Sequence, residues 1–359
     1  MSRRARWAGL AVVVTAAALL CGLSACSVSP GYYLQAAGGQ IALLSHSRPI
    51  DDVVAESETP QSLRANLERA RQIRRFASDS LGLPDNDSYA RYTALDRPYV
   101  SWNVFAADPL SVRLKEWCVP VAGCIGYLGY FNKADADARA AELRAQGYDV
   151  YVGGVPAYST LGWFSDPLLS TFIAWPETEF ARLLFHELTH QIAYVKDDTE
   201  FNESFATAVE EAGVERWMAQ PGKAPLREGF ARAQMMREDF RALVLDFRSQ
   251  LQALYASDLP ASDKLARKSA LIAAMGERYR QIKAERWGGY AGYDRWFAQP
   301  INNALLASVG VYTGKVPAFR QMLAACGDAL PRFYKGVKQI ASQSRDARDR
   351  ALASGVCPD

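Results

Sequence analysis

The stretch Ala181-Arg-Leu-Leu-Phe-His186-Glu187-Leu-Thr-His190-Gln-Ile-Ala193 places an H-E-x-x-H pattern inside an apolar, helix-forming run. The chain has only three histidines, and two of them stand here four residues apart. Positions i and i+4 of a helix lie on one face, so both imidazoles can bind one metal ion. The carboxylate of Glu187 can act there as a general base toward a water molecule. We therefore expect this helix to be the centre of the fold and of a metal site.

A catalytic metal site needs a third protein ligand, and the next helical segment offers one. Lys196-Asp-Asp-Thr199 should break the first helix after about Val195, and Thr199 can cap a second helix from Glu200 to about Ala219. Glu203 lies on this second helix among side chains that we expect to be buried. The competing acids are Glu200, Glu210 and Glu211, and a solvated acidic face is the non-functional interpretation.

The first 26 residues predict export. Ser2 to Arg6 is basic, residues 7–20 are apolar but short for a membrane span, and Leu23-Ser-Ala-Cys26 ends the segment. This ending resembles the lipobox of bacterial lipoproteins, which implies that residues 1–25 are a signal peptide and that Cys26 carries the lipid. Ser27 rather than Asp follows, which by the same resemblance implies the outer membrane, facing the periplasm.

Composition argues against a nucleic-acid binder. The formal charge of the whole chain is +2. Loss of Arg3, Arg4 and Arg6 with the signal peptide lowers the 41 Lys and Arg to 38, against 39 Asp and Glu. A near-neutral protein lacks the basic surface that nucleic acid requires. The apolar fraction of 49% supplies enough core for one large domain or two small ones.

Cysteine usage agrees with an oxidising compartment. Beyond Cys21 and Cys26, four cysteines remain, and an even number in an exported protein predicts two disulfides. Three pairings are possible. Cys118–Cys124 with Cys326–Cys357 is the economical one.

The pattern of the remaining chain predicts a mainly helical α+β protein with a small mixed β-sheet before the H-E-x-x-H helix. We expect residues 26–60 to be a tether with a short helix. Residues 61–359 should form the main domain, with a sheet-containing part (61–175) and a helical part (176–359). Expected helices beyond the two described above cover residues 32–44, 62–81, 133–146, 226–255, 262–287, 302–311 and 317–325. Expected strands cover residues 99–105, 126–131 and 148–152.

H-E-L-T-H followed by Asn202-Glu203-Ser-Phe-Ala resembles the gluzincin zinc peptidases, of which thermolysin is the type. Together with the lipobox, A-Y-S-T-L-G-W-F at 157–164 and I-N-N-A at 301–304, these motifs resemble a bacterial family labelled putative aminopeptidases. The resemblance implies a zincin-like fold, one Zn²⁺ ion held by His186, His190 and Glu203, and Glu187 as the general base. The chain departs from gluzincins in its short connection to Glu203. It also lacks the G-x-M-E-N strand that holds the free amine in aminopeptidase N-like enzymes.

The resemblance also implies where substrate and oxyanion would lie. Zinc peptidases of this type bind peptide as an extra strand beside the sheet that precedes the metal helix. Tyr158, Ser159 and Thr160 are therefore candidate substrate-binding residues, with a structural connector as the alternative. A tyrosine C-terminal to the site is expected to stabilise the oxyanion. The candidates are Tyr312 first, then Tyr290 and Tyr293.

These patterns favour an envelope-anchored zinc peptidase that hydrolyses peptide bonds, either as an aminopeptidase or as an endopeptidase. Its partners would be a peptide and, through Cys26, a membrane; the oligomeric state is not predicted. The alternative function is a non-catalytic envelope lipoprotein that uses a peptidase-like fold as a binding scaffold. A scaffold has no physical need for Glu187, which argues against that alternative.

Overall fold

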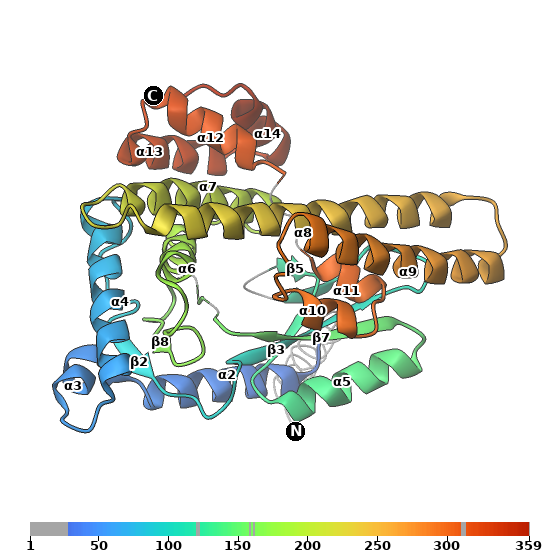
Figure 1. Cartoon of the computed structure of the whole chain (residues 1–359), viewed down its shortest axis with the longest axis horizontal. Coiled ribbons are helices and arrows are strands. Elements are labelled where there is room, and N and C mark those ends of the chain that lie inside the picture. Colours follow the sequence, from blue (N-terminus) through green and yellow to red (C-terminus); the bar gives the residue numbers. More distant parts are fainter. Residues whose placement is uncertain (1–27, 120–122, 158, 161, 310–313, 359) are drawn as a thin grey trace, which may run out of the picture.

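A computed structural model describes residues 28–119, 123–157, 159–160, 162–309 and 314–358. It confirms a mainly helical α+β protein with short strands (Figure 1). Three hydrophobic clusters hold the described chain together. The first surrounds the H-E-x-x-H helix, the second lies under a three-stranded sheet, and the third fills a long helical hairpin.

The H-E-x-x-H helix, α6 (Glu177–His190), packs against α7 (Thr199–Met218). The expectation that α6 continues to Val195 was wrong, because Asn202 binds both the N–H and the carbonyl of Val195, each at 2.8 Å. These bonds hold the chain in a turn. Thr199 was also the wrong cap: the carboxylate of Asp198 accepts from the N–H of Phe201 and caps α7 instead.

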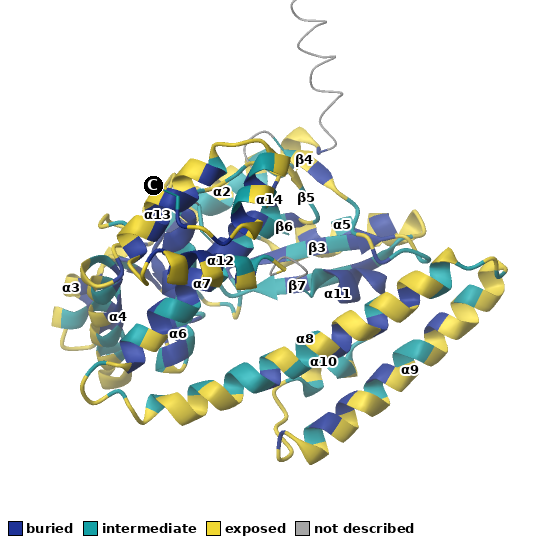
Figure 2. Ribbon diagram, turned by 90° about the horizontal axis from the view of Figure 1, so that it is seen from above, coloured by how far each residue is buried: buried dark blue, intermediate teal, exposed yellow. Residues whose placement is uncertain are grey.

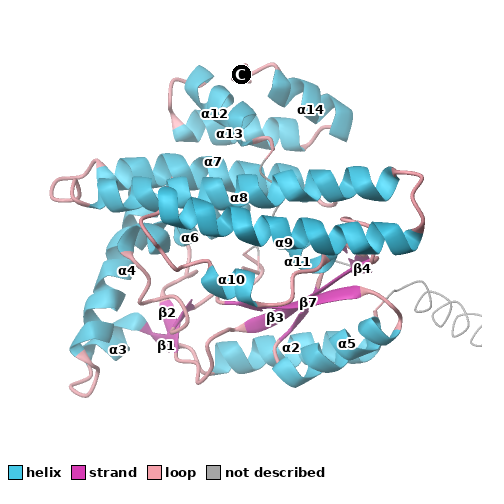
Figure 3. Ribbon diagram, turned by 45° about the vertical axis from the view of Figure 1, so that its right-hand side comes forward, coloured by secondary structure: helices cyan, strands magenta, loops and turns pink. Residues whose placement is uncertain are grey.

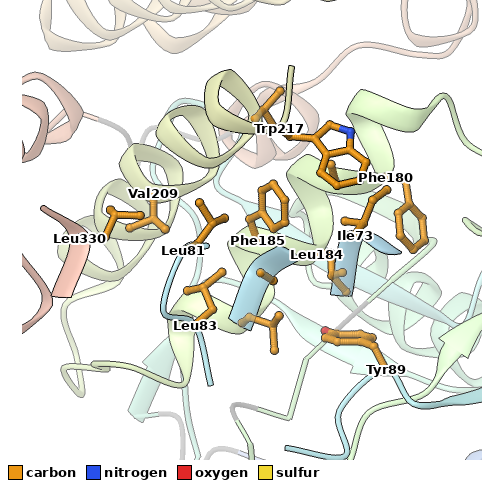
Figure 4. Packing of buried hydrophobic residues seen from close by; sticks show 14 of the residues in the cluster. Ile73, Leu81, Leu83, Tyr89, Phe180, Leu184, Phe185, Val209, Trp217 and Leu330 are labelled. Carbon is orange, nitrogen blue, oxygen red and sulfur yellow. The ribbon is translucent and has the colours of Figure 1, made fainter. Parts of the chain in front are cut away.

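The largest cluster packs α6 and α7 against α4 (Gln61–Asp79) and the chain that follows it. Figure 4 shows Phe185 and Leu184 of α6 grouped with Ile73 of α4 and with Trp217 of α7. The helices approach closely because α7 has a glycine at the contact. A Cβ atom on Gly213 would lie 2.7 Å from the ring of Phe185.

The main sheet consists of β6 (Leu128–Tyr130), β3 (Ser101–Ala107) and β7 (Asp149–Val155), in that order (Figure 2). Helix α5 (Lys133–Ala145) joins β6 to β7 and packs beneath the sheet; Asn132 caps it as expected. The predicted strand–helix–strand unit is therefore present. Strand β3 lies between its two strands and runs antiparallel to both.

Five further strands of two or three residues were not predicted, because each is too short to show alternation and, unlike β6, none lies in a predicted strand run. They are β1 (Arg48–Pro49), β2 (Arg91–Thr93), β8 (Leu168–Leu169), β4 (Trp117–Val119) and β5 (Gly123–Ile125). The first three form a mixed sheet and the last two a hairpin. A disulfide joins Cys118 to Cys124 across that hairpin, as expected.

The N-terminal segment contributes more to the fold than the tether and short helix that we expected. Helix α2 (Pro30–Ser45) is followed by β1 and α3 (Ile50–Ala55), and Leu43, Ile50 and Val53 enter the largest cluster. Among the described residues, no helix combines the length and apolar character needed to cross a bilayer.

The predicted hairpin is formed by α8 (Leu226–Ala256) and α9 (Ala261–Glu285). Figure 2 shows it standing off from α6 and α7, with exposed residues along much of its length. Two short helices pack at its base. They are α10 (Asp294–Ala298), which was not expected, and α11 (Asn303–Ser308), which is shorter than expected and is capped by Asn302.

The C-terminal unit packs on one side of α7 (Figures 1 and 3). It contains the expected α12 (Val316–Ala325) and two further helices, α13 (Leu330–Ala341) and α14 (Arg345–Ala353). The predicted disulfide Cys326–Cys357 closes the unit. Arg348 of α14 forms a buried ion pair with Asp198, the residue that caps α7.

We expect Arg348→Met to lower the free energy of unfolding by about 3 kcal/mol, because it leaves the buried Asp198 carboxylate without its counter-ion. Burial opposes ionisation of Asp198, yet hydrogen bonds from Arg348 and from the Phe201 N–H lower its pKa. The stabilisation should therefore be present above the ordinary aspartate pKa and disappear as pH falls through the lowered value.

Urea unfolding at neutral pH and at pH 3 measures the loss of unfolding free energy and its dependence on pH. The matched control is Arg280→Met, which removes an exposed pair with Glu277 and should leave stability almost unchanged. Equal losses in the two variants would contradict a structural role for the buried pair.

Candidate metal centre

The three predicted metal ligands lie close together in the structure. The Nε2 atoms of His186 and His190 both face the carboxylate of Glu203, at 3.1 Å and 3.7 Å. The ligand atoms of all three residues lie within 4.8 Å of one another, the arrangement expected around one metal ion. Glu203 is thus the acid that the fold brings to the two imidazoles, and Glu200 and Glu211 pair with Lys315 and Arg320.

The short connection between His190 and Glu203 spans the distance because side-chain hydrogen bonds fold it into a tight turn. Asn202 holds the backbone of Val195, and Asp198 caps α7 directly before it. The next helix therefore starts immediately after the turn. Glu203 lies in the first turns of α7, opposite the last turn of α6. A loop longer than these 12 residues is not required.

A second carboxylate orients the first imidazole. The Nδ1 atom of His186 lies 2.8 Å from Glu210, which is itself paired with Arg182 at 2.7 Å. Burial raises the pKa of Glu210, but the hydrogen bond to His186 and the charge of Arg182 outweigh it and lower the pKa overall. An ionised Glu210 makes Nδ1 the donor and leaves the Nε2 lone pair for a metal. Glu210, one of the acids that competed with Glu203 in the sequence, thus orients His186, and Thr207 lines the nearby cleft.

The electrostatics of the site fit a cation. Burial, followed by the charges of Glu203 and Asp166, raises the pKa of Glu187 to about 7, although His186 opposes the shift. Burial, with the charge of His186, lowers the pKa of His190 to about 4. Acids gathered this closely repel each other unless positive charge lies between them. Two imidazoles and a carboxylate form a ligand set that zinc accepts, so the residues fit a divalent metal ion.

A cleft of about 1040 Å³ opens beside His186 and Glu187. Its walls come from α6, α7, α8 and the chain on either side of residues 310–313. A second hollow of about 700 Å³ shares part of this wall and is lined mainly by apolar and aromatic side chains. The residues common to both are Trp175, Glu179, Arg237 and Tyr293.

The segment predicted to bind substrate is anchored near Glu187. Tyr158 lies outside the described residues. The N–H and Oγ1 of Thr160 donate to the buried Asp166 at 2.8 and 2.9 Å, and Ser159 donates to it at 3.3 Å. The charge of Asp166 contributes to the raised pKa of Glu187, so this anchor lies within electrostatic range of the site.

The tyrosines considered as partners of an oxyanion fall into three groups. Tyr312 lies outside the described residues. Tyr293 lines the cleft, and Tyr290 lines the adjoining hollow. Two others, Tyr127 and Tyr194, were missed: the charge of Glu203 helps to raise the pKa of both, after desolvation of their hydroxyl groups.

The sequence carries a weak signal for only one of the missed tyrosines. Tyr194 stands four residues after His190, and their rings lie 6.5 Å apart. Tyr127 rests on Phe105 of β3, with ring centres 5.6 Å apart, a contact that only the tertiary fold creates.

We expect Glu210→Gln to weaken divalent metal binding by ~10–100-fold, because Nδ1 of His186 exchanges a charged carboxylate acceptor for a weaker, neutral amide oxygen. Glu211→Gln is the matched control, since this neighbouring acid pairs with Arg320 at the surface and does not contact a histidine. Competition with a chelator measures both affinities. Similar losses in the two variants would contradict the orienting role of Glu210.

Comparison with known proteins extends these observations. A family model described as "putative aminopeptidase" matches residues 31–352. No curated protein and no solved structure matches the chain. The matched region includes both site helices, the main sheet and almost all of the C-terminal unit. The chain therefore belongs to the putative aminopeptidase family.

Proposed function

We propose that this protein is a zinc-dependent peptidase with a gluzincin-like site. The observation that carries the proposal is the convergence of two imidazole nitrogens and the Glu203 carboxylate, with Glu187 on the same helix as both histidines. His186, His190 and Glu203 would hold the ion. Two nitrogen ligands and one carboxylate oxygen favour zinc and leave an open position.

Zinc, when bound, supplies a Lewis acid that polarises the scissile carbonyl and acidifies water. Among the protein's own side chains, Glu187 would act as the general base. A carboxylate with a pKa of about 7 can accept a proton from the attacking water and return it to the leaving amine near neutral pH. Its position directly after His186 on α6 holds it beside the ligand set.

A tyrosine hydroxyl would stabilise the oxyanion. Among the described tyrosines, Tyr127 is the one whose pKa responds to both Glu203 and Glu187. Desolvation, followed by these charges, raises that pKa to about 12, so the hydroxyl stays protonated and can donate a hydrogen bond. Tyr312 remains a prediction for the same role.

The shape of the site supports a peptide substrate. A cleft of about 1040 Å³ joined to a hollow of about 700 Å³ exceeds the space that a single small molecule fills. Strand β7 is an edge strand that leads into the Val155–Phe164 segment. We propose that peptide backbone pairs there, with Ser159 and Thr160 held in place by Asp166.

We further propose that Cys26 is lipidated and anchors the protein in the outer membrane, facing the periplasm. The two disulfides support an oxidising compartment. Cys26 precedes the first described residue, Val28, by two positions, so an anchor there would hold the folded protein close to the lipid.

Glu187→Gln should lower kcat for peptide hydrolysis by ~10³-fold or more, because it removes the general base. Metal content should stay at the wild-type level, since Glu187 is not among the three ligands. Turnover of a mixed peptide library and zinc analysis of the purified protein measure the two quantities.

Glu215→Gln, which changes an exposed acid on α7, is the control and should retain activity. Full activity of Glu187→Gln would contradict the mechanism. A wild-type protein that binds no zinc and cleaves no peptide would instead favour the non-catalytic binding scaffold.

The aminopeptidase mode rests on family membership and has its own test. We expect acetylation of the substrate's N-terminus to lower kcat/KM by ~10²-fold, since a site built for an ammonium group loses a charged hydrogen bond. Paired free and acetylated peptides of the same sequence give the ratio. Equal rates would identify an endopeptidase and leave the metal mechanism intact.

A further inference from the structure

Helix α2 exposes a stripe of uncharged residues that contains two large apolar side chains. Leu34 and Ile41 are 75% and 67% exposed, which makes them two of the most exposed large apolar residues of the described chain. Gly31, Gly38, Ala42 and Ser45 continue the exposed face at helical spacing. Large apolar side chains that share one exposed helix face form a candidate contact surface.

The inner face of α2 cannot turn to bury this stripe, because specific contacts fix it. The amide of Gln35 donates to the carbonyl of Gly129 at 3.0 Å and accepts from the N–H of Phe131 at 3.1 Å. These bonds cover the outer edge of β6, the edge strand of the main sheet. Gly39 lies so close to Phe131 that a Cβ atom would fall 2.1 Å from its ring. The exposure of Leu34 and Ile41 is therefore built into the fold.

The same segment carries no acidic side chain, lysine or arginine. Charged residues make up 22% of the chain, yet residues 27–47 contain no Asp, Glu, Lys or Arg. Helix α4, of similar length, has a charged residue in every turn. An uncharged outer face avoids the cost of desolvating ions, which matters only where the face meets an apolar phase.

We propose that the outer face of α2 lies in the surface of the lipid bilayer, with Leu34 and Ile41 inserted at the boundary between head groups and acyl chains. Helix α2 starts four residues after Cys26, so it begins beside the proposed lipid anchor. Two large side chains present too little area for a stable dimer interface, whereas they suffice to seat a helix that is already tethered. The inference does not depend on peptidase activity.

Site-directed spin labelling of the full-length protein tests this placement. Leu34→Cys, Ile41→Cys and Leu265→Cys variants are purified from membranes, labelled with a nitroxide and reconstituted in phosphatidylethanolamine–phosphatidylglycerol vesicles. Leu265 on α9 is the matched control, because it is an exposed leucine (43%) on a different helix. The mass of the N-terminal peptide, measured first, shows separately whether Cys26 carries acyl chains.

We expect the ratio of oxygen to aqueous nickel-complex accessibility to be at least ~3-fold higher at positions 34 and 41 than at 265, as for side chains about 5–10 Å inside the interface. Equal ratios at all three positions would overturn the proposal, whether or not Cys26 is acylated. Dipolar broadening between labels at position 34 would show that a second copy covers the stripe, and would also overturn it. Failure of the protein to float with the vesicles would have the same consequence.

Discussion

The contact between α6 and α7 at Gly213 is the constraint on which the site depends. The absence of a side chain there lets Phe185 pack directly on the α7 backbone. Because α6 carries both histidines and α7 carries Glu203 and Glu210, the separation of these two helices sets the distances among all four side chains. A wider separation would leave buried carboxylates and imidazoles without partners, at considerable cost.

The rest of the fold supports that contact from two sides. Helix α4 fills the apolar space next to α6, and the C-terminal unit fixes the start of α7 through Arg348 and Asp198. The disulfide Cys326–Cys357 closes the C-terminal unit that carries Arg348. The geometry of the candidate site is thus supported by a disulfide and an ion pair that do not involve the three candidate ligands.

Features encoded by local spacing could be predicted from the sequence, whereas features created by tertiary contact could not. His186, His190 and Glu187 follow from one helical repeat, and Glu203 follows from the start of the next helix. The end of α6 was missed because a side chain, Asn202, satisfies the backbone that a longer helix would have used. Tyr127 lies within electrostatic range of Glu203, and its packing on Phe105 of β3 is a tertiary contact that no local pattern records.

The central claim is that His186, His190 and Glu203 hold one zinc ion. X-ray absorption at the zinc edge of the purified full-length protein tests it most directly. The account predicts one zinc per chain, surrounded by two imidazole nitrogens and by oxygen, with no sulfur. A shell with a single imidazole, a sulfur ligand, or no zinc at stoichiometric occupancy would contradict it.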